Sequence, residues 1–174
     1  GVIIANAVDG GVLLTGTASV TGELIPIPAV CISVESGKAI RKWIKDEPNL
    51  LAVIDMRNFS RPIRARNVIA TLPGSSKKYK KEKIIIGGHL DSWDLATGAM
   101  DNGIGSFTIL DIARVFQSLN LRPKRTIEFV MFMGEEQGLL GSKAIVKKYK
   151  EEGKIDQVQL MVNLDMVNNA KGFN

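Results

Sequence analysis

Residues 83–91, KIIIGGHLD, place an apolar run directly before a histidine and an aspartate. A short apolar run of this kind, rich in isoleucine, is typical of a buried strand. In an open α/β sheet the carboxyl ends of parallel strands meet at one edge, where ligands bind. His89 and Asp91 are therefore expected at the ligand-binding edge of such a sheet.

Two further apolar runs end in the same way. Residues 126–133 lead to Glu135 and Glu136, and residues 157–164 lead to Asp165. Zinc in proteins is bound by imidazole nitrogen and carboxylate oxygen. A pair of glutamates ahead of a helix is often only a solvated helix start. Acidic or imidazole groups at three successive strand ends instead predict a polynuclear metal site, and hence a metallohydrolase.

The spacing of these groups indicates which of them bind metal, which one orients the histidine and which one accepts a proton. Asp91, two residues after His89, suits a carboxylate that orients the imidazole and raises its basicity. Asp101 starts a helix, and its two oxygens can bridge two cations. Because Glu135 and Glu136 are adjacent, one can bind a metal while the other faces a water. Hydrolysis at a two-metal site needs such a nearby base.

The chain from residue 59 onward alternates strands and helices. Apolar spacing predicts helices over 104–119 and 139–151, between the strands named above. This order predicts an α/β fold with a three-layer α/β/α sheet and right-handed crossovers. The segments 65–72 and 83–88 are joined by a lysine-rich loop, and we expect them to pair as antiparallel strands.

Residues 1–58 are predicted to form a different unit. The pattern predicts strands over 2–5, 27–34 and 50–56 and a helix over 35–46, with Trp43 in the core. The segment 58–62, which contains Pro62, marks the boundary with the second domain, residues 59–174.

Composition excludes several classes of function. The 174 residues carry a net charge of +5, but the lysines fall in local runs at 77–83 and 147–150, and aromatic residues make up only 6%. Single-strand nucleic-acid binders require stacking aromatics among their basic residues, so we expect these lysines on a solvated surface and no nucleic-acid partner. No apolar stretch approaches the roughly 18 residues that span a bilayer.

Four short motifs resemble the di-zinc exopeptidases of metallopeptidase family 28, with the strongest likeness to its plasma glutamate carboxypeptidase branch. They are GGHLDSWD at 87–94, GAMDNG at 98–103, EEQG at 135–138 and NLDM at 163–166. The resemblance implies two Zn²⁺ ions and a peptide or dipeptide substrate. It does not distinguish an aminopeptidase from a carboxypeptidase, and it leaves homodimerisation open.

The resemblance also implies a role for each site residue. His89 and Asp165 would bind one zinc, Glu136 the other, and Asp101 would bridge both. Glu135 would be the general base, with Asp91 supporting His89. The same family typically has a cis peptide after the bridging aspartate, which here is the bond from Asp101 to Asn102.

One family ligand is missing from the sequence. The family takes a last histidine from well downstream of the NLDM motif, whereas His89 is the single histidine of this chain. The chain is therefore expected to be a fragment of a longer enzyme, with weak or absent activity by itself. Residues 1–58 resemble the later part of a protease-associated domain, and the resemblance alone implies a secreted or periplasmic location.

Two other functions share these sequence features. A glutaminyl-peptide cyclotransferase has the same fold but uses one zinc for acyl transfer, and the His89-Leu-Asp91 motif favours the peptidase. A receptor-like relative would keep the fold without metals. The retention of all the predicted ligands argues against that loss.

Overall fold

The structure is a computed structural model that describes residues 1–19 and 22–167. The chain divides into two compact units, residues 1–63 and residues 64–174. The last seven residues of the predicted second domain, 168–174, lie outside the described residues. Within the described part of the chain, no helix is both long enough and apolar enough to cross a membrane.

The first unit pairs two short strands and packs one helix beside them. Its elements are β1 (Val2–Ala5), β2 (Ala29–Ile32) and α1 (Val34–Asp46). The strands are parallel, with Val2 opposite Ala29. The α1 helix begins after Ser33, whose hydroxyl accepts a hydrogen bond from the Ser36 N–H at 3.1 Å and so satisfies one of the free donors of the first turn.

Two expectations for this unit are wrong. Residues 50–56 form no strand, and the side chains of Leu51 and Val53 are 90% and 92% exposed. A strand needs a neighbouring strand to satisfy its backbone groups, and residues 50–56 pair with none of the described strands. Trp43, expected in the core, is 56% exposed because α1 covers only a two-stranded sheet.

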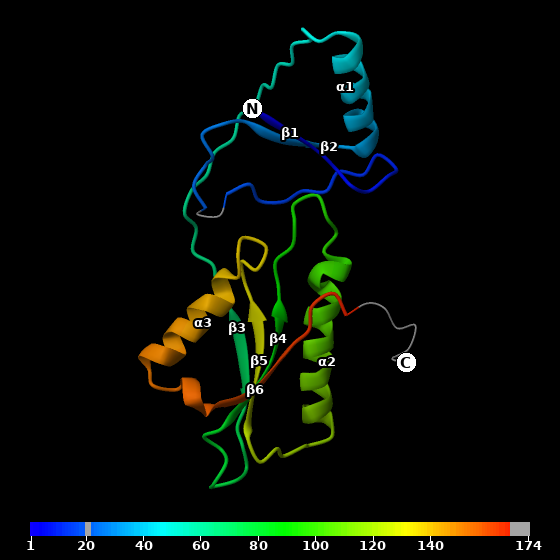
Figure 1. Ribbon diagram of the computed structural model, residues 1–174. Coiled ribbons are helices and arrows are strands. Elements are labelled where there is room, and N and C mark those ends of the chain that lie inside the picture. Colours follow the sequence, from blue (N-terminus) through cyan, green and yellow to red (C-terminus); the bar gives the residue numbers. More distant parts are fainter. Residues whose placement is uncertain (20–21, 168–174) are drawn as a thin grey trace. The chain divides into compact units, whose positions relative to one another are not determined.

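The second unit is a mixed α/β sheet with helices (Figure 1). Its strands are β3 (Val68–Leu72), β4 (Lys83–His89), β5 (Thr126–Phe132) and β6 (Val158–Asn163). Its helices are α2 (Ile104–Ser118) and α3 (Leu140–Glu151), with the short turns η1 (Ala99–Gly103) and η2 (Ile155–Gln157).

The strand order in this sheet is β3-β5-β4-β6. The strands β4, β5 and β6 are parallel, and β3 runs antiparallel to β5. The predicted antiparallel pair of 65–72 with 83–88 is therefore wrong, because β5 lies between these two strands. The parallel register places His89 opposite Phe132, so the chain leaves β4 and β5 at the same edge.

Successive residues of β5 point to opposite faces of the sheet, and a helix covers each face. On one face Ile127 and Phe129 form a core with Ile109 of α2. On the other, Val130 and Phe132 pack with side chains of α3. Ile109 and Val130 are each 1% exposed, and burying such a side chain contributes about 1.5–3 kcal/mol. These two cores fix the parallel strands that carry the site.

A buried charged cluster lies toward the other end of β5. Lys83 Nζ is 2.6 Å from Glu128 Oε1, and the Tyr149 hydroxyl donates to Glu128 Oε2. The strand over 126–133 thus contains a buried acid that its apolar pattern hides. Lys83, expected on the solvated surface with the other lysines, has a side chain only 16% exposed.

The β6 strand forms one edge of the described sheet, and three of its apolar side chains remain exposed. Leu160, Met161 and Val162 are 52%, 47% and 38% exposed. Because neighbouring residues alternate between faces, both faces of this edge present apolar surface.

Candidate metal centre

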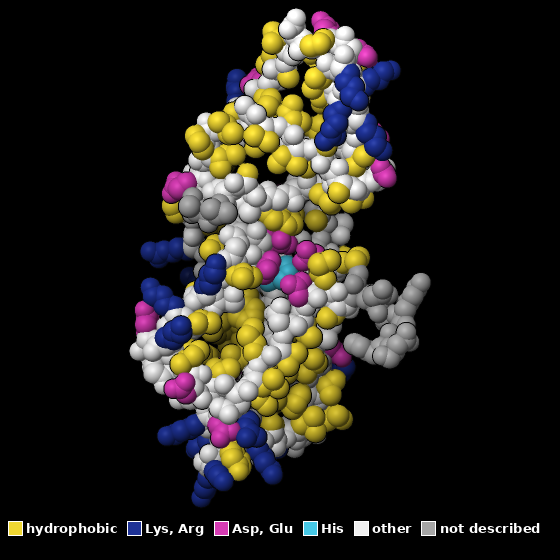
Figure 2. Space-filling model, viewed as in Figure 1, with side chains coloured by type: hydrophobic (Ala, Val, Ile, Leu, Met, Phe, Trp, Pro, Cys, Tyr) yellow, Lys and Arg dark blue, Asp and Glu magenta, His cyan; other side chains and the backbone are white. Residues whose placement is uncertain are grey.

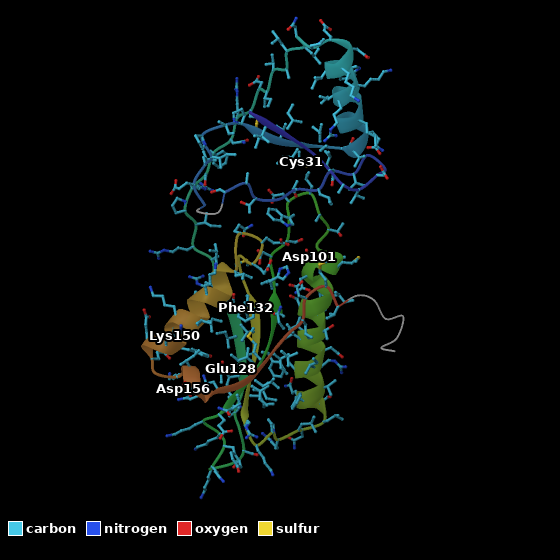
Figure 3. The ribbon with its side chains drawn as sticks, in the orientation of Figure 1. Cys31, Asp101, Glu128, Phe132, Lys150 and Asp156 are labelled. Atoms are coloured by element: carbon cyan, nitrogen blue, oxygen red, sulfur yellow. The ribbon has the colours of Figure 1, made fainter. Side chains whose placement is uncertain are left out.

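Each predicted site residue lies at a strand end, just beyond one, or just ahead of a helix. His89 ends β4, and its carbonyl accepts a hydrogen bond from the Ser106 hydroxyl of α2 at 2.8 Å. Asp101 belongs to η1, which leads into α2. Figure 3 labels Asp101 at one end of the sheet and Glu128 toward the other. The site and the buried charged cluster therefore occupy opposite ends of the strands.

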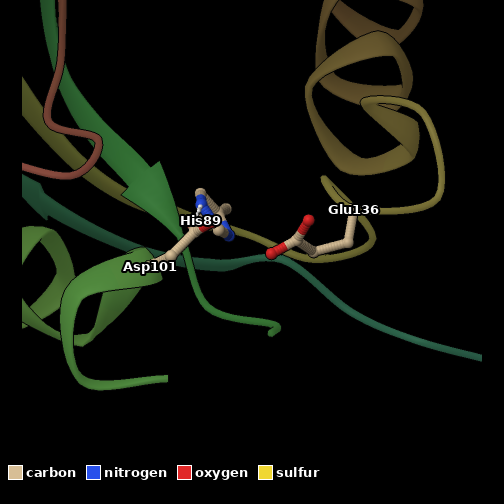
Figure 4. Close-up of side chains that lie close together, drawn as sticks. All are labelled: His89, Asp101 and Glu136. Carbon is tan, nitrogen blue, oxygen red and sulfur yellow. Dashed lines mark ion pairs between the residues drawn. The ribbon is translucent and has the colours of Figure 1, made fainter. Parts of the chain in front are cut away.

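Three of the predicted ligands face one another (Figure 4). His89, Asp101 and Glu136 each offer one ligand atom, and these atoms all lie within 4.8 Å of one another. His89 Nε2 is 2.9 Å from Asp101 Oδ1 and 3.5 Å from Asp165 Oδ1. In Figure 2 the histidine is surrounded by acidic side chains.

The donor set fits a divalent cation. His89 Nε2 and Glu136 Oε1 are buried without a hydrogen-bond partner in the part of the chain that the structure describes. The contact from Asp101 to Nε2 is close, but it does not have hydrogen-bond geometry. Buried polar atoms in native proteins almost always have a partner. A cation among imidazole and carboxylate donors would satisfy both atoms.

The charge balance agrees with this fit. The ion pairs of Asp101 and Asp165 in the described part of the chain are with His89, and neither carboxylate pairs with a lysine or arginine. The site is thus locally acidic within a protein of net charge +5. Crowded carboxylates without a cationic side chain repel one another, and a bound divalent cation would offset that repulsion.

Burial and the neighbouring charges raise the pKa values of the two site glutamates. Burial raises the pKa of Glu135, and the negative charges of Asp165 and Asp91 raise it further, against the opposing effect of His89. Burial likewise raises the pKa of Glu136, with Asp101 as the next largest cause. A carboxylate with a raised pKa is a better proton acceptor than an ordinary glutamate.

The imidazole is held in the tautomer that a metal requires. Burial opposes protonation of His89, but the charge of Asp165 and the backbone carbonyl of Asp91 raise its pKa overall. Nδ1 lies 3.0 Å from that carbonyl oxygen. Because a carbonyl only accepts, Nδ1 carries a hydrogen, and in the neutral imidazole Nε2 is then the nitrogen with the lone pair that a metal binds.

The Asp91 side chain has a contact that the sequence did not indicate. Its Oδ1 lies 3.8 Å from His89 Nδ1, too far for a hydrogen bond. The carboxylate instead accepts from the backbone N–H of Glu135 at 3.1 Å and from that of Glu136 at 3.2 Å. Asp91 thus supports the imidazole through its backbone carbonyl and the two glutamates through its side chain.

Asn102 likewise holds the backbone next to a predicted ligand, at the end of β6. Its amide donates to the Leu164 carbonyl at 2.8 Å and accepts from the Met166 N–H at 3.1 Å, so it holds the chain on both sides of Asp165. The bond between Asp101 and Asn102 is cis, as the family resemblance implies. Sequence analysis did not single out Asn102 as a site residue, because a contact with backbone groups leaves no pattern in the sequence.

Comparison with known proteins agrees with this geometry. Over 153 residues the chain is 31% identical to carboxypeptidase Q of Xenopus laevis, covering 87% of this chain and 32% of that protein. It is 38% identical over 146 residues to a probable leucine aminopeptidase of Arthroderma otae, covering 76% of this chain and 37% of that protein. The chain thus spans about a third of the length of these relatives.

A solved structure shows the same fold. The chain is 27% identical to a zinc aminopeptidase from Bacillus subtilis, with a TM-score of 0.66, covering 95% of this chain and 37% of that one. The model of peptidase family M28 matches residues 67–172, which include the ends of β4, β5 and β6 and every predicted ligand. This match, which covers the strand ends and the acidic cluster described above, shows that the chain belongs to peptidase family M28.

Proposed function

We propose that this chain carries most of the metal site of a zinc-dependent exopeptidase that releases N-terminal residues or splits dipeptides. The observation that carries the proposal is the convergence of His89, Asp101 and Glu136, with two buried ligand atoms that lack a hydrogen-bond partner among the described residues. The relatives named carboxypeptidase and aminopeptidase support an exopeptidase without choosing the peptide terminus.

The ligand atoms divide between two zinc ions in this proposal. His89 and Asp165 would hold one ion and Glu136 the other, and Asp101 would be shared between them. The distances of 2.9 Å and 3.5 Å from His89 Nε2 to Asp101 and Asp165 support that grouping. When bound, zinc polarises a scissile carbonyl and lowers the pKa of a water at the site.

The protein's own groups then position and move the proton. Glu135 accepts a proton from the attacking water and delivers it to the leaving amine, a task that suits its raised pKa. Asp91 holds the backbone of Glu135 and Glu136 and keeps the hydrogen on His89 Nδ1.

We further propose that the sheet belongs to a larger three-layer α/β/α domain. The exposed apolar residues Leu160, Met161 and Val162 at the β6 edge support a continuation of the sheet there. A last zinc ligand would come from the same continuation, because His89 is the single histidine here. The assignment of residues 1–58 to a protease-associated domain and the secreted or periplasmic location stay predictions.

A zinc titration of this chain by calorimetry tests the metal site. We expect Asp101→Ala to abolish tight binding, because it removes the bridging carboxylate. The matched control is Asp111→Ala, which removes an exposed aspartate paired with Arg114 on α2 and should bind zinc like the parent. Equal zinc binding by Asp101→Ala and the parent would contradict the bridging role.

Peptide hydrolysis is tested in the full-length protein, with a dipeptide panel and mass spectrometry of the products. We expect zinc-dependent release of free amino acids, lost on Glu135→Gln. Cyclised N-terminal glutamine as the sole product would favour the cyclotransferase instead. The 174 residues alone are expected to be weakly active at most, and robust zinc-dependent turnover by them would contradict the fragment prediction.

A further inference from the structure

The segment between β5 and α3 carries both Glu135 and Glu136, so its position decides where two site carboxylates lie. The segment folds on itself through backbone hydrogen bonds from the N–H groups of Gly138 and Leu139 to the Glu135 carbonyl, at 2.8 and 2.9 Å. These bonds shape the loop but do not attach it to the sheet. The attachment must come from groups outside the loop.

One such attachment is Asn67, the residue just before β3. Its Oδ1 accepts from the Met133 N–H at 2.9 Å, and its Nδ2 donates to the Gly141 carbonyl at 2.9 Å. Met133 immediately follows β5, and Gly141 lies in the first turn of α3. A single side chain therefore ties together the two ends of the segment that carries the glutamates.

Both partners of this contact are chemically restricted. A primary amide offers an acceptor and donors in one plane, whereas a carboxylate lacks the donor and an aliphatic side chain lacks both. A Cβ at residue 141 would lie 2.2 Å from Asn67 Oδ1 and 2.5 Å from the Met133 carbonyl oxygen. The chain has glycine at 141, the one residue that leaves room for this contact.

We propose that Asn67 is a positioning residue for the metal centre. It fixes both ends of the loop, while Asp91 holds the loop's middle through the N–H groups of Glu135 and Glu136. The inference rests on the proposed zinc site, since its consequence is the placement of the Glu136 carboxylate toward His89. Among the described residues, the side-chain hydrogen bonds of Asn67 go to the backbone of Met133 and Gly141 and not to a predicted ligand.

The test compares Asn67→Ala with a variant that loses the same kind of contact elsewhere. Thr126→Val is the matched control, because the Thr126 hydroxyl also makes two backbone contacts, donating to the Lys80 carbonyl at 2.8 Å and accepting from the Gly74 N–H at 3.0 Å. Thr126 begins β5 at the end away from the site. A general loss of stability would affect both variants alike.

Three readouts separate positioning from stability. Zinc affinity is measured by competition with a chelator, and the visible spectrum of the Co²⁺-substituted protein reports ligand geometry. Hydrogen exchange of the Met133, Glu135 and Glu136 amides is followed without metal. We expect Asn67→Ala to weaken zinc by about 10–100-fold, the usual effect of losing a group that orients a ligand. Its Co²⁺ spectrum should change and its loop amides should exchange faster, while Thr126→Val leaves all three as in the parent.

A second variant covers a failure of Asn67→Ala to fold. Asn67→Asp keeps an acceptor for the Met133 N–H but sets a carboxylate oxygen, which has no hydrogen to donate, against the Gly141 carbonyl. It should also speed exchange in the loop. If the amides of Glu135 and Glu136 exchange at the parent's rate in whichever variant folds, the role of Asn67 is overturned, even if that variant has a different zinc affinity.

The outcomes also distinguish this inference from the proposed function. If the parent binds no zinc or Co²⁺, the proposed metal site fails, and the positioning of the loop is decided by exchange alone. If the parent binds zinc and Asn67→Ala binds it equally well with the same Co²⁺ spectrum, the metal site stands and the inference about Asn67 fails.

Discussion

Replacing Glu128 by glutamine is expected to destabilise residues 64–167 by about 3 kcal/mol. Glu128 and Lys83 have side chains only 7% and 16% exposed, with Nζ and Oε1 2.6 Å apart. The Tyr149 hydroxyl donates to the same carboxylate, and burial, followed by that hydrogen bond, raises the pKa of Tyr149. The variant leaves the Lys83 ammonium without its anion in a largely dry site.

Breaking a buried pair by removing one partner typically costs about 3–5 kcal/mol. We take the lower end because Lys83 retains some contact with water. With a urea dependence of about 2 kcal/mol per molar, the midpoint should fall by about 1.5 M. Unfolding is followed by the fluorescence of Trp93 in a Trp43→Phe background, since the chain has two tryptophans and only Trp93 lies in the second unit.

Two further variants make the reasoning refutable. Glu82→Gln breaks a more exposed pair with Arg125, which should cost at most about 1 kcal/mol. The triple variant of Lys83→Met, Glu128→Leu and Tyr149→Phe removes every polar member of the cluster and should come within about 1 kcal/mol of the parent. A fall in the midpoint of less than about 0.3 M for Glu128→Gln would show that the cluster is not a desolvated ion pair.

Three further predictions concern pH, packing and the metal. The pKa of Glu35 is lowered to about 2, chiefly by hydrogen bonds to its carboxylate from the Glu35 and Gly10 backbone N–H groups. The stability that this carboxylate gives the first unit should therefore be present above pH 4.5 and lost as the pH falls through about 2. A carboxyl NMR titration checks it. Gly105→Ala would put a Cβ 2.3 Å from the Leu164 carbonyl oxygen and should lower zinc affinity in calorimetry, by displacing the chain next to Asp165. Zinc at about 100 times its dissociation constant should stabilise the protein by about 2.7 kcal/mol in thermal unfolding, and a chelator should remove that gain.

Each of these predictions has a contrary result. Glu35→Gln should remove the acid-dependent loss, and the same loss in that variant would assign it to other groups. Gly16→Ala serves as the control for Gly105→Ala, since its Cβ would meet no atom within 4 Å and residue 16 belongs to the first unit. Equal zinc affinity in Gly105→Ala and the parent would contradict the packing argument. An unfolding midpoint that zinc does not change would contradict a site formed in the folded state.

Residues that end apolar runs were the most predictable part of the fold and the site. His89 and the two glutamates follow β4 and β5 in the sequence, and the parallel register brings them to one edge. The partner of β3 was not predictable in this way. A lysine-rich loop connects β3 to β4 and suggested a hairpin, whereas β5, more than fifty residues later, inserts between them.

Hidden polar contacts escaped sequence analysis for a different reason. Glu128 is one acid in an apolar run, and its pairing with Lys83 depends on a register that only the folded sheet defines. Asn67 and Asn102 form hydrogen bonds with backbone groups, which every residue carries. The sequence therefore contains no complementary residue type from which these contacts could be predicted. The exposed Leu51 and Val53 show the converse, since an apolar run without a partner strand remains a loop.

The pairing of β4 with β6 contains one irregularity that bears on how the chain tolerates insertions. Lys83 pairs with Val158 and Ile84 with Leu160, so Gln159 is skipped as a bulge far from the site. An extra residue ahead of this bulge can be absorbed there without turning Asp165. An extra residue after Leu160 would shift the strand by about 3.3 Å and turn Asp165 to the opposite face. Length variation between α3 and the bulge is therefore compatible with the metal centre, whereas the short stretch from the bulge to Asp165 has a fixed length.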